Sequence, residues 1–221
     1  SRGLGDVYKR QVKGVYASVF FADSKAYMVA TSNVIDQEKM AVIIQEAVGV
    51  QRGDYFYPSL SGVGRSLNYY PVGDEQPADG IAEVAVGLGK YIVDGGMSLR
   101  FSPRHPAHVL QTSTLDLALR DTQRYFYALS TTAGEGEFSI DEGFDIARLN
   151  VDDAGKQGFL KYLVSTYDFQ NERIVDSDEG VGRKVVTFAN VLRHDVFPLA
   201  QSLDFMLTKG QQEMGRPVEI E

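Results

Sequence analysis

The sequence predicts an α+β fold, in which helices accompany sheets built from strands that neighbour one another along the chain. One long segment, 194–215, carries apolar residues at steps of three and four, as one face of a helix does. Elsewhere, short apolar runs alternate with glycine-containing turns, as in strands joined by hairpins. Adjacent strands of this kind argue against a doubly wound parallel sheet, in which helices alternate with the strands.

The first third of the chain is predicted to contain a helix, a buried strand and a hairpin. Residues 12–32 follow a helical pattern. The run "AVIIQEAVGV" at 41–50 shows no alternation, which is typical of a strand covered on both faces. The aromatic-rich stretch "DYFYPSLSGVGRSLNYYP" at 54–71 is interpreted as two strands around a turn at 61–64.

The middle of the chain is predicted to continue with strands before it becomes helical. Residues 81–96, "IAEVAVGLGKYIVDGG", predict a strand, a glycine turn and a short helix. The segment "SLRFSP" at 98–103 predicts another strand, and an amphipathic helix is expected at 113–129. The acidic, glycine-rich residues 134–158 are expected to form a surface excursion.

The last third is predicted to hold further strands, one long helix and a final strand. The strands are expected at 159–168, 172–177 and 183–192, with "DEGVGR" as the turn between the last two. In the helix at 194–215, Asp195 is a plausible N-cap and Gly215 a plausible C-terminal stop. The strand "RPVEIE" at 216–221 follows directly.

The composition excludes several classes of function. The chain has 22 Lys and Arg against 30 Asp and Glu, a net charge of −8, so no nucleic-acid partner is expected. The absence of cysteine excludes disulfides, thiolate nucleophiles and cysteine-ligated metals. No apolar run approaches the roughly 20 residues that span a bilayer, so no membrane partner is expected. An acidic, cysteine-free chain without an export signal is expected to be cytoplasmic.

Glu219 and Glu221 are the sharpest candidates for chemistry. Residues two apart on a strand share a face, so these carboxylates are expected about 6.5–7 Å apart along the strand. Paired carboxylates suit Mg²⁺, which is often held by one or two of them together with substrate phosphates. The alternative is a solvated edge strand with alternating polar residues, and the spacing alone does not decide between the two.

Gln45 and Glu46 form a second candidate, because a polar step inside an apolar run costs free energy unless its groups find partners. One interpretation is a strand end that hydrogen-bonds a purine, and the other is a strand that emerges into solvent. Gly87 and Gly89 form an isolated glycine pair, which favours an ordinary turn over a phosphate loop. The three histidines form no recognisable catalytic or metal-binding arrangement.

Several segments, in this order, resemble the N-terminal nucleotide-binding domain of the phosphoenolpyruvate synthase and pyruvate phosphate dikinase family. "VKGVYASVFFADSKAY" is similar to the family's helix before the hinge strand, and "MAVIIQEAVG" to its "A-V-x-V-Q-x-M-V" strand. "SGVGRSLNYYP" resembles "S-G-V-x-F-S/T-x-N-P", "VAVGLGKYIVDGG" resembles "GLGE-x-V-V-x-G", and "MGRPVEIE" resembles "x-G-x-P-x-D-I-E-W/F". None of these motifs is specific by itself, but together, in the order of the family, they extend over residues 12–221.

This resemblance implies an ATP-grasp-type fold that holds ATP and Mg²⁺ between two α+β lobes. Gln45 matches the hinge glutamine beside the adenine, with Glu46 and Ala47 as backbone neighbours. Glu221 matches a glutamate that faces metal and phosphate. Glu219 stands where Asp is usual, one methylene longer, and Lys90 replaces the usual Glu after the glycine turn, which puts the function of that turn in doubt.

The resemblance also implies that the chain is a fragment. Residues 1–11 have no apolar period and are expected to be a non-native leader, which leaves 12–221 as a partial domain, incomplete at both ends. The family's phosphate-binding Lys and Arg precede this region, and a Gln-x-Arg element follows it. The carrier histidine and the pyruvate-binding barrel belong to domains outside this sequence, so this piece alone is not expected to turn over. A homodimer of the parent is one arrangement that the resemblance allows.

The function that follows is the ATP-binding part of a phosphoenolpyruvate synthase-like phosphotransferase. In the parent, ATP would phosphorylate a histidine of the carrier domain, which then transfers the phosphoryl group to pyruvate. One alternative is a dikinase-type phosphotransferase with another acceptor, such as glucan or rifampin. The other is a non-catalytic regulatory or interaction domain of the same fold.

Overall fold

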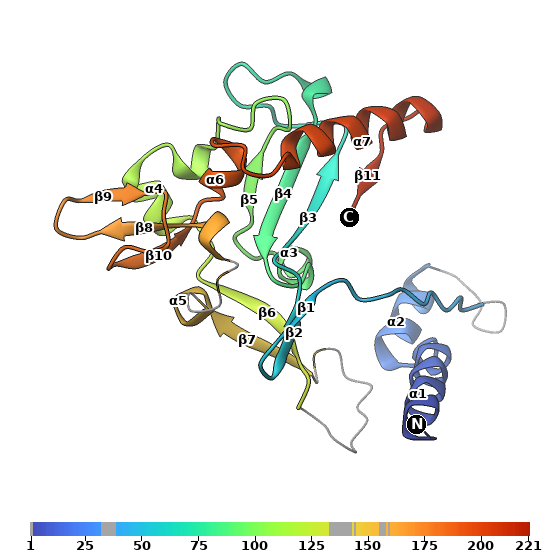
Figure 1. The fold of residues 1–221 in the computed structure, drawn as a ribbon. Coiled ribbons are helices and arrows are strands. Elements are labelled where there is room, and N and C mark those ends of the chain that lie inside the picture. Colours follow the sequence, from blue (N-terminus) through green and yellow to red (C-terminus); the bar gives the residue numbers. More distant parts are fainter. Residues whose placement is uncertain (1, 32–38, 133–142, 144, 155–157, 159) are drawn as a thin grey trace. The chain divides into compact units, whose positions relative to one another are not determined.

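The computed structural model of the protein describes residues 2–31, 39–132, 143, 145–154, 158 and 160–221. These residues belong to two compact units. The N-terminal unit comprises residues 1–48 and 132–145, and the main unit comprises residues 49–131 and 146–221. Mixed helices and antiparallel sheets confirm the predicted α+β class (Figure 1).

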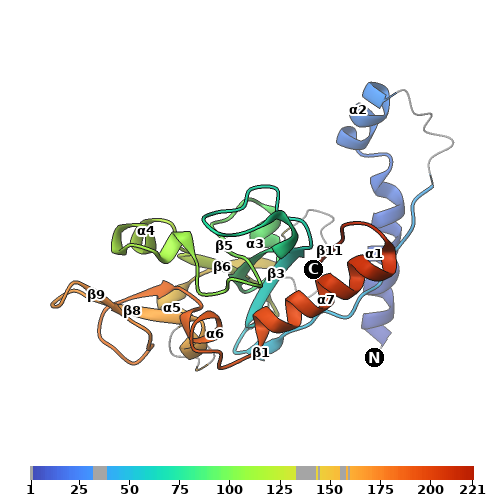
Figure 2. The same cartoon turned by 90° about the horizontal axis from the view of Figure 1, so that it is seen from above.

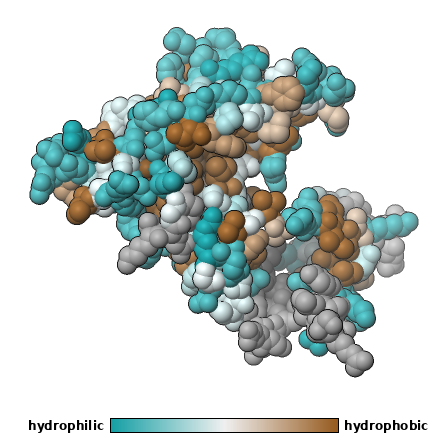
Figure 3. Space-filling view, in the orientation of Figure 1, coloured by the Kyte–Doolittle hydropathy of each residue, from teal (hydrophilic) through white to brown (hydrophobic). Residues whose placement is uncertain are grey.

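The N-terminal unit contains two helices, α1 (Arg2–Ser18) and α2 (Ala22–Thr31). They confirm the helical pattern predicted for 12–32 except at 19–21, where a turn separates the two helices, and at 32, which lies outside the described residues. Helix α1 also includes most of residues 1–11, the segment expected from the sequence to be a non-native leader. The non-native origin of this segment stays a prediction. A hydrogen bond from Ser24 Oγ to the Ser18 carbonyl, 2.8 Å long, links the two helices. Hydrophobic surface gathers over α2 (Figure 3), where Tyr27 and Val29 are exposed.

The strand predicted at 41–50 is wrong for most of its length. Residues 41–49 form neither helix nor strand, and only Val50 begins a strand. Ile43 and Ile44 are more than 80% exposed, at 82% and 84%. A strand needs a neighbour to satisfy its backbone groups, and no described segment pairs with this one. The continuous apolar run shows that the segment is hydrophobic, but it does not show whether another strand pairs with it.

The main unit contains three antiparallel sheets (Figure 1). The β3 sheet has the order β11-β3-β4-β5, with β3 at Leu60–Arg65, β4 at Ile81–Val86, β5 at Leu99–Phe101 and β11 at Glu219–Ile220. The β6 sheet has the order β1-β2-β6-β7, with β1 at Val50–Arg52, β2 at Tyr55–Tyr57, β6 at Tyr125–Ser130 and β7 at Ile146–Asn150. The β8 sheet has the order β10-β8-β9, with β8 at Val164–Asp168, β9 at Arg173–Val175 and β10 at Arg183–Val186.

Most of the helices of the main unit are short. They are α3 (Lys90–Val93), α4 (Leu115–Arg120), α5 (Val151–Ala154) and α6 (Ala189–Leu192), with 3-10 turns at Pro77–Asp79, Leu110–Thr112 and Leu160–Tyr162. The long helix is α7 (Leu199–Met214), which runs alongside β3 and β11 in both views (Figures 1 and 2). None of the described helices is long and apolar enough to cross a membrane.

Helix α7 confirms the clearest helical pattern of the sequence, with one correction at its start. Gly215 ends the helix in the left-handed conformation, at φ 66°, and its N–H donates to the Gln211 carbonyl. The N-cap position is held by Pro198 and not by Asp195. Asp195 lies before the helix with a positive φ of 49°, and its carboxylate accepts a hydrogen bond from the side chain Nε2 of Gln201 in α7.

Three further predictions need correction. The turn expected at 61–64 lies within β3, because these residues pair with β4. The helix expected at 113–129 ends at Arg120, and its last part is β6, where pairing with β2 and β7 outweighs helical periodicity. Within 134–158, the described residues include β7 and α5, whose Val151 and Ala154 are buried. The strands predicted around β4, β5 and β9 are confirmed. The strand predicted at 159–168 begins only at Val164, after the 3-10 turn Leu160–Tyr162, with residue 159 outside the described residues, and α6 replaces the end of the strand predicted at 183–192.

The core of the main unit joins all three sheets. Its largest fully buried side chains include Tyr57, Phe101, Phe126 and Phe188. Tyr57 and Phe126 are in ring contact across β2 and β6, with their centroids 5.0 Å apart. Burial of this size is the main stabilising contribution in a domain of this kind, and it fixes the sheets on which the candidate site is built.

The buried side chain of Gln123 links the end of β4 to the start of β6 by hydrogen bonds. Gln123 accepts a hydrogen bond from the Val86 N–H at 2.8 Å and donates to the Val86 carbonyl at 3.0 Å. Its amide therefore pairs with Val86 as a neighbouring strand would. Because β4 ends at Val86, this contact holds the glycine turn that follows.

Replacing Gln123 with leucine should therefore lower the free energy of unfolding by about 2–4 kcal/mol, since it leaves two buried backbone groups without partners. Urea denaturation followed by circular dichroism measures this loss. Gln212→Leu on the exposed surface of α7 is the matched control and should change stability little. Equal effects of the two substitutions would contradict the bridging role of Gln123.

Candidate functional site

The β3 sheet brings together three sequence segments that are far apart along the chain. Strand β3 lies at the start of "SGVGRSLNYYP", β4 ends in "VAVGLGKYIVDGG", and β11 lies in "MGRPVEIE". In the register of the sheet, Arg65 of β3 pairs with Glu219 of β11 and with Ile81 of β4. The final strand predicted at 216–221 is thus confirmed in part, and it is an edge strand of this sheet.

The two faces of the β3 sheet differ in chemistry. One face is apolar, because Gly64, Ala82 and Ile220 lie on it and Leu203 and Leu207 of α7 pack against Gly64. Residues directly opposite one another in an antiparallel sheet share a face. By this rule the other face carries a charged side chain from every strand, namely Glu219 of β11, Arg65 of β3, Glu83 of β4 and Arg100 of β5. We call this second surface the charged face.

Arg65 lies between two carboxylates on the charged face. Its Nε donates to Glu219 Oε2 at 2.5 Å, and its Nη1 lies 3.6 Å from Glu83 Oε1. The Glu83 carboxylate also accepts a hydrogen bond from Ser98 Oγ at 2.7 Å. The side chains of Arg65, Glu219 and Glu83 are 41%, 50% and 32% exposed, so a ligand in solution can reach all three.

Arg100 is a second cation on the charged face, and its partners are neutral. Its Nη2 donates to Asn68 Oδ1 at 2.9 Å and to the Tyr70 carbonyl at 2.7 Å. Asn68 is buried and its amide donates to the buried Glu75, which fixes the orientation of the whole group. Beside it, a cavity of about 610 Å³ is lined by Glu83, Ser98, Arg100 and Arg193 together with residues 72–75, 107–111 and 113.

The glycine turn after β4 adjoins the same sheet. Gly87 has a φ of 83°, and its carbonyl accepts a hydrogen bond from Ser61 Oγ at 2.7 Å. The next residue, Leu88, donates its N–H to the Tyr127 carbonyl of β6. Lys90 begins α3 and forms an ion pair with Asp94 one turn later, at 3.1 Å. The turn is therefore held from both the β3 and the β6 sheets.

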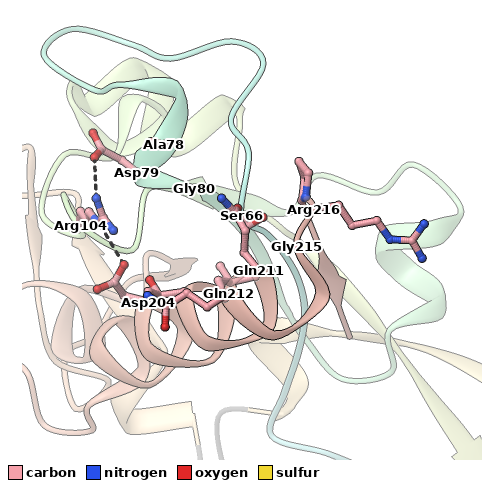
Figure 4. Close-up of a pocket in the computed structure, with 13 residues that line it drawn as sticks. Ser66, Ala78, Asp79, Gly80, Arg104, Asp204, Gln211, Gln212, Gly215 and Arg216 are labelled. Atoms are coloured by element: carbon pink, nitrogen blue, oxygen red, sulfur yellow. Dashed lines mark hydrogen bonds and ion pairs between the residues drawn. The ribbon is translucent and has the colours of Figure 1, made fainter.

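A second cavity, of about 510 Å³, lies between α7 and the end of the β3 sheet (Figure 4). Arg104 lies on its wall between Asp79 and Asp204, with Nε 2.9 Å from Asp204 Oδ1 and Nη1 3.5 Å from Asp79 Oδ1. A backbone hydrogen bond from Gln76, followed by the bond and charge of His105, lowers the pKa of Asp79 below its usual range. Figure 4 shows Arg216 pointing away from this group. Arg104 is thus already paired with two carboxylates, whereas Arg100 on the charged face donates to neutral groups, so the charged face is the better candidate for an anionic ligand.

Comparison with models of known protein families gives a match that covers nearly the whole chain. The sequence model of a family described as "Pyruvate phosphate dikinase, AMP/ATP-binding domain" matches residues 3–221. The chain belongs to this family. No curated protein and no solved structure is matched.

Membership in the pyruvate phosphate dikinase family agrees with the resemblance read from the sequence. It makes the chain the AMP/ATP-binding part of a dikinase-like protein, in a family of kinase-type phosphotransferases. The match begins at residue 3 and so includes most of the segment that the sequence set apart at 1–11. It also spans both compact units.

The predicted nucleotide-binding residues of the pyruvate phosphate dikinase family domain lie in both units. Gln45, Glu46 and Ala47 belong to the N-terminal unit, in the segment without regular structure, and all three are exposed. Glu219 and Glu221 belong to the main unit, where Glu219 lies on the charged face. Glu221 is exposed and follows β11 directly. The adenine-side and phosphate-side residues are thus carried by separate parts of the fold.

The carboxylates at the end of the chain suit a divalent cation in number and type. Mg²⁺ is commonly held by one or two carboxylates, with phosphate oxygens and water completing its shell. Among the described residues, no group of three or more acidic or histidine side chains could hold a metal by itself. Glu219 and Glu221 therefore fit a metal ion whose remaining ligands are phosphate oxygens and water. The ion pair with Arg65 occupies one of the two.

Sequence reasoning missed Arg65, Glu83 and Arg100. A signal was present for Glu83 and Arg100, because each is a charged residue between apolar neighbours inside a short strand, whereas Arg65 ends β3 between Gly64 and Ser66. Alternation along a strand shows only which residues of that strand lie on the same side. The register between the strands is needed to place Arg65, Glu83 and Arg100 on one face of the sheet. The charge that neutralises Glu219 lies 154 positions away along the chain, beyond the reach of any local pattern.

Proposed function

We propose that this chain is the ATP-binding part of a phosphoenolpyruvate synthase-like phosphotransferase, with nucleotide phosphates bound at the charged face of the β3 sheet. The convergence of three family-like segments on one sheet, with an acidic final strand and a glycine turn, supports this proposal most strongly. The parent protein would then transfer a phosphoryl group from ATP to a histidine of a carrier domain and onward to pyruvate.

In this proposal each functional residue has one task. Gln45 recognises the adenine, with the backbone at Glu46 and Ala47 beside it. Glu219 and Glu221 face the phosphates, and Mg²⁺ bound there would neutralise charge on the transferring phosphoryl group. Arg65 supplies a fixed positive charge between Glu219 and Glu83. Phosphoryl transfer depends mainly on positioning and on such charge stabilisation, so these groups match the chemistry that the site would need.

Nucleotide binding by the chain itself gives the direct test. We expect Glu221→Gln to weaken Mg·ATP binding about tenfold or more, because it removes a charged partner of the metal. Isothermal titration calorimetry with ATP and Mg²⁺ measures the change. Glu213→Gln, at an exposed position of α7, is the control and should bind as the unchanged protein does. Equal binding by both variants would refute the assignment of Glu221.

Labelling of the parent protein separates an enzyme from a regulatory domain of the same fold. With radiolabelled ATP, the parent should form phosphohistidine, and Glu221→Gln should abolish the label while the fold stays intact by circular dichroism. Tight ATP binding without any label in the unchanged parent would favour the non-catalytic alternative. Label that passes to glucan or rifampin in place of pyruvate would change the acceptor and keep the ATP-binding role.

A further inference from the structure

The position of Arg65 has a consequence for how the site handles metal ions. Arg65 is fixed on β3, which pairs with β4 on one side and β11 on the other. Its guanidinium contacts Glu219 directly and Glu83 at longer range. Glu219 therefore carries a built-in counterion.

Glu221 differs from Glu219 in this respect. Among the residues that the structure describes, no ion pair involves Glu221, and its side chain is exposed. A divalent cation that approaches β11 meets one carboxylate that is already neutralised and one that is not. Since a guanidinium and a metal ion repel each other and seek the same carboxylate oxygens, both cannot hold Glu219 at full strength.

The Arg65–Glu219 pair contributes little to stability, which makes it suitable for such a role. Both side chains are about half exposed, at 41% and 50%. Ion pairs at that exposure are worth little, because solvent screens them and ordering two long side chains costs entropy. Glu83 is anchored separately by Ser98, at 2.7 Å, so it does not depend on Arg65 for its position. Loss of Arg65 should leave the β3 sheet folded.

We propose that Arg65 is a positioning residue, which occupies the Glu219 carboxylate and directs a divalent cation to Glu221. The cation is then bound less tightly than two free carboxylates would bind it. This inference rests on the proposed function, because it concerns the same phosphate-facing end of the sheet. It assigns different tasks to two acids that the sequence presents as equivalent: Glu221 is the metal ligand, and Glu219 is the partner of a protein cation.

Titration of the full 221-residue chain with Mn²⁺ alone, followed by electron paramagnetic resonance, tests the inference without nucleotide. Arg65→Met should tighten Mn²⁺ binding about tenfold at low salt, because it removes a like charge and frees a carboxylate. Glu219→Gln should cancel this gain when it is combined with Arg65→Met, because the carboxylate that Arg65 releases is then absent. Arg65→Lys keeps the charge and should stay near the unchanged protein.

Arg100→Met is the matched control, since it removes a cation of the same face whose partners are neutral. It should leave the Mn²⁺ affinity close to that of the unchanged protein. If Arg65→Met fails to fold by circular dichroism, Arg65→Gln, which removes the charge but keeps a polar end group, serves in its place. Unchanged Mn²⁺ affinity in the folded Arg65 variants would overturn the inference, as would an equal gain on removal of Arg100.

A second titration with ATP separates this inference from the proposed function. If the Mn²⁺ pattern appears but no variant binds ATP, the role of Arg65 stands and the nucleotide site is refuted. If ATP binds in a metal-dependent way while Arg65→Met leaves Mn²⁺ affinity unchanged, the nucleotide site stands and the role of Arg65 is refuted.

Discussion

Replacing Phe126 with alanine should lower the free energy of unfolding of the main unit by about 3–5 kcal/mol. Phe126 lies on β6, is fully buried and contacts the ring of Tyr57 on β2. The substitution removes a large apolar side chain from the place where the sheets meet, and the surrounding strands cannot close the cavity without losing their pairing.

Urea denaturation monitored by circular dichroism measures the loss for Phe126. Phe205→Ala provides the matched control, because Phe205 is a phenylalanine on α7 that is 63% exposed. It should cost less than about 1 kcal/mol, since little apolar area is returned to water. A small effect at Phe126 would show that the β6 sheet does not pack as the structure has it.

Replacing Gly87 with alanine should cost about 2–4 kcal/mol through a different cause. The φ of Gly87 is 83°, a conformation that side chains disfavour. A Cβ there would also lie 2.6 Å from the backbone oxygen of Tyr127, which is closer than real Cβ atoms approach. Because the turn joins β4 to α3 beside the charged face, the substitution should also weaken ATP binding.

Gly73→Ala separates the two causes for Gly87. Gly73 has a similar positive φ of 64°, but nothing lies within 4 Å of the Cβ that alanine would add. It should cost only about 1 kcal/mol, the conformational penalty without the clash. Differential scanning calorimetry of the two variants gives the comparison. Equal melting temperatures would mean that the turn moves away from Tyr127 at little cost.

The sequence was most informative where one element could be recognised from its own residues. The three- and four-residue period of α7, the stop at Gly215 and the strand–turn–helix of 81–96 were all readable. The sequence was least informative where a partner decides the outcome. The run at 41–50 has strand composition but lacks a described neighbour, whereas β6 has helical character and is a strand because β2 and β7 pair with it.

The candidate site shows the same limit. The acidic residues Glu219 and Glu221 could be singled out, because their spacing on a strand is a local property. Arg65, the cation that pairs with Glu219, could not be singled out from the sequence, because only the register of β3 and β11 brings the two side chains together. The family match adds the ATP-binding class and leaves the task of each acid to experiment.

The pairing of β3 with β11 also has a consequence for the order in which the protein folds. Arg65 and Glu219 are separated by 154 positions, so a ribosome completes almost all of the main unit between synthesising one and the other. Bringing two segments so distant along the chain together costs conformational entropy, which the contacts of the finished sheet offset. We therefore expect the phosphate-facing edge to assemble late during folding, after the strands that neighbour one another along the chain have paired.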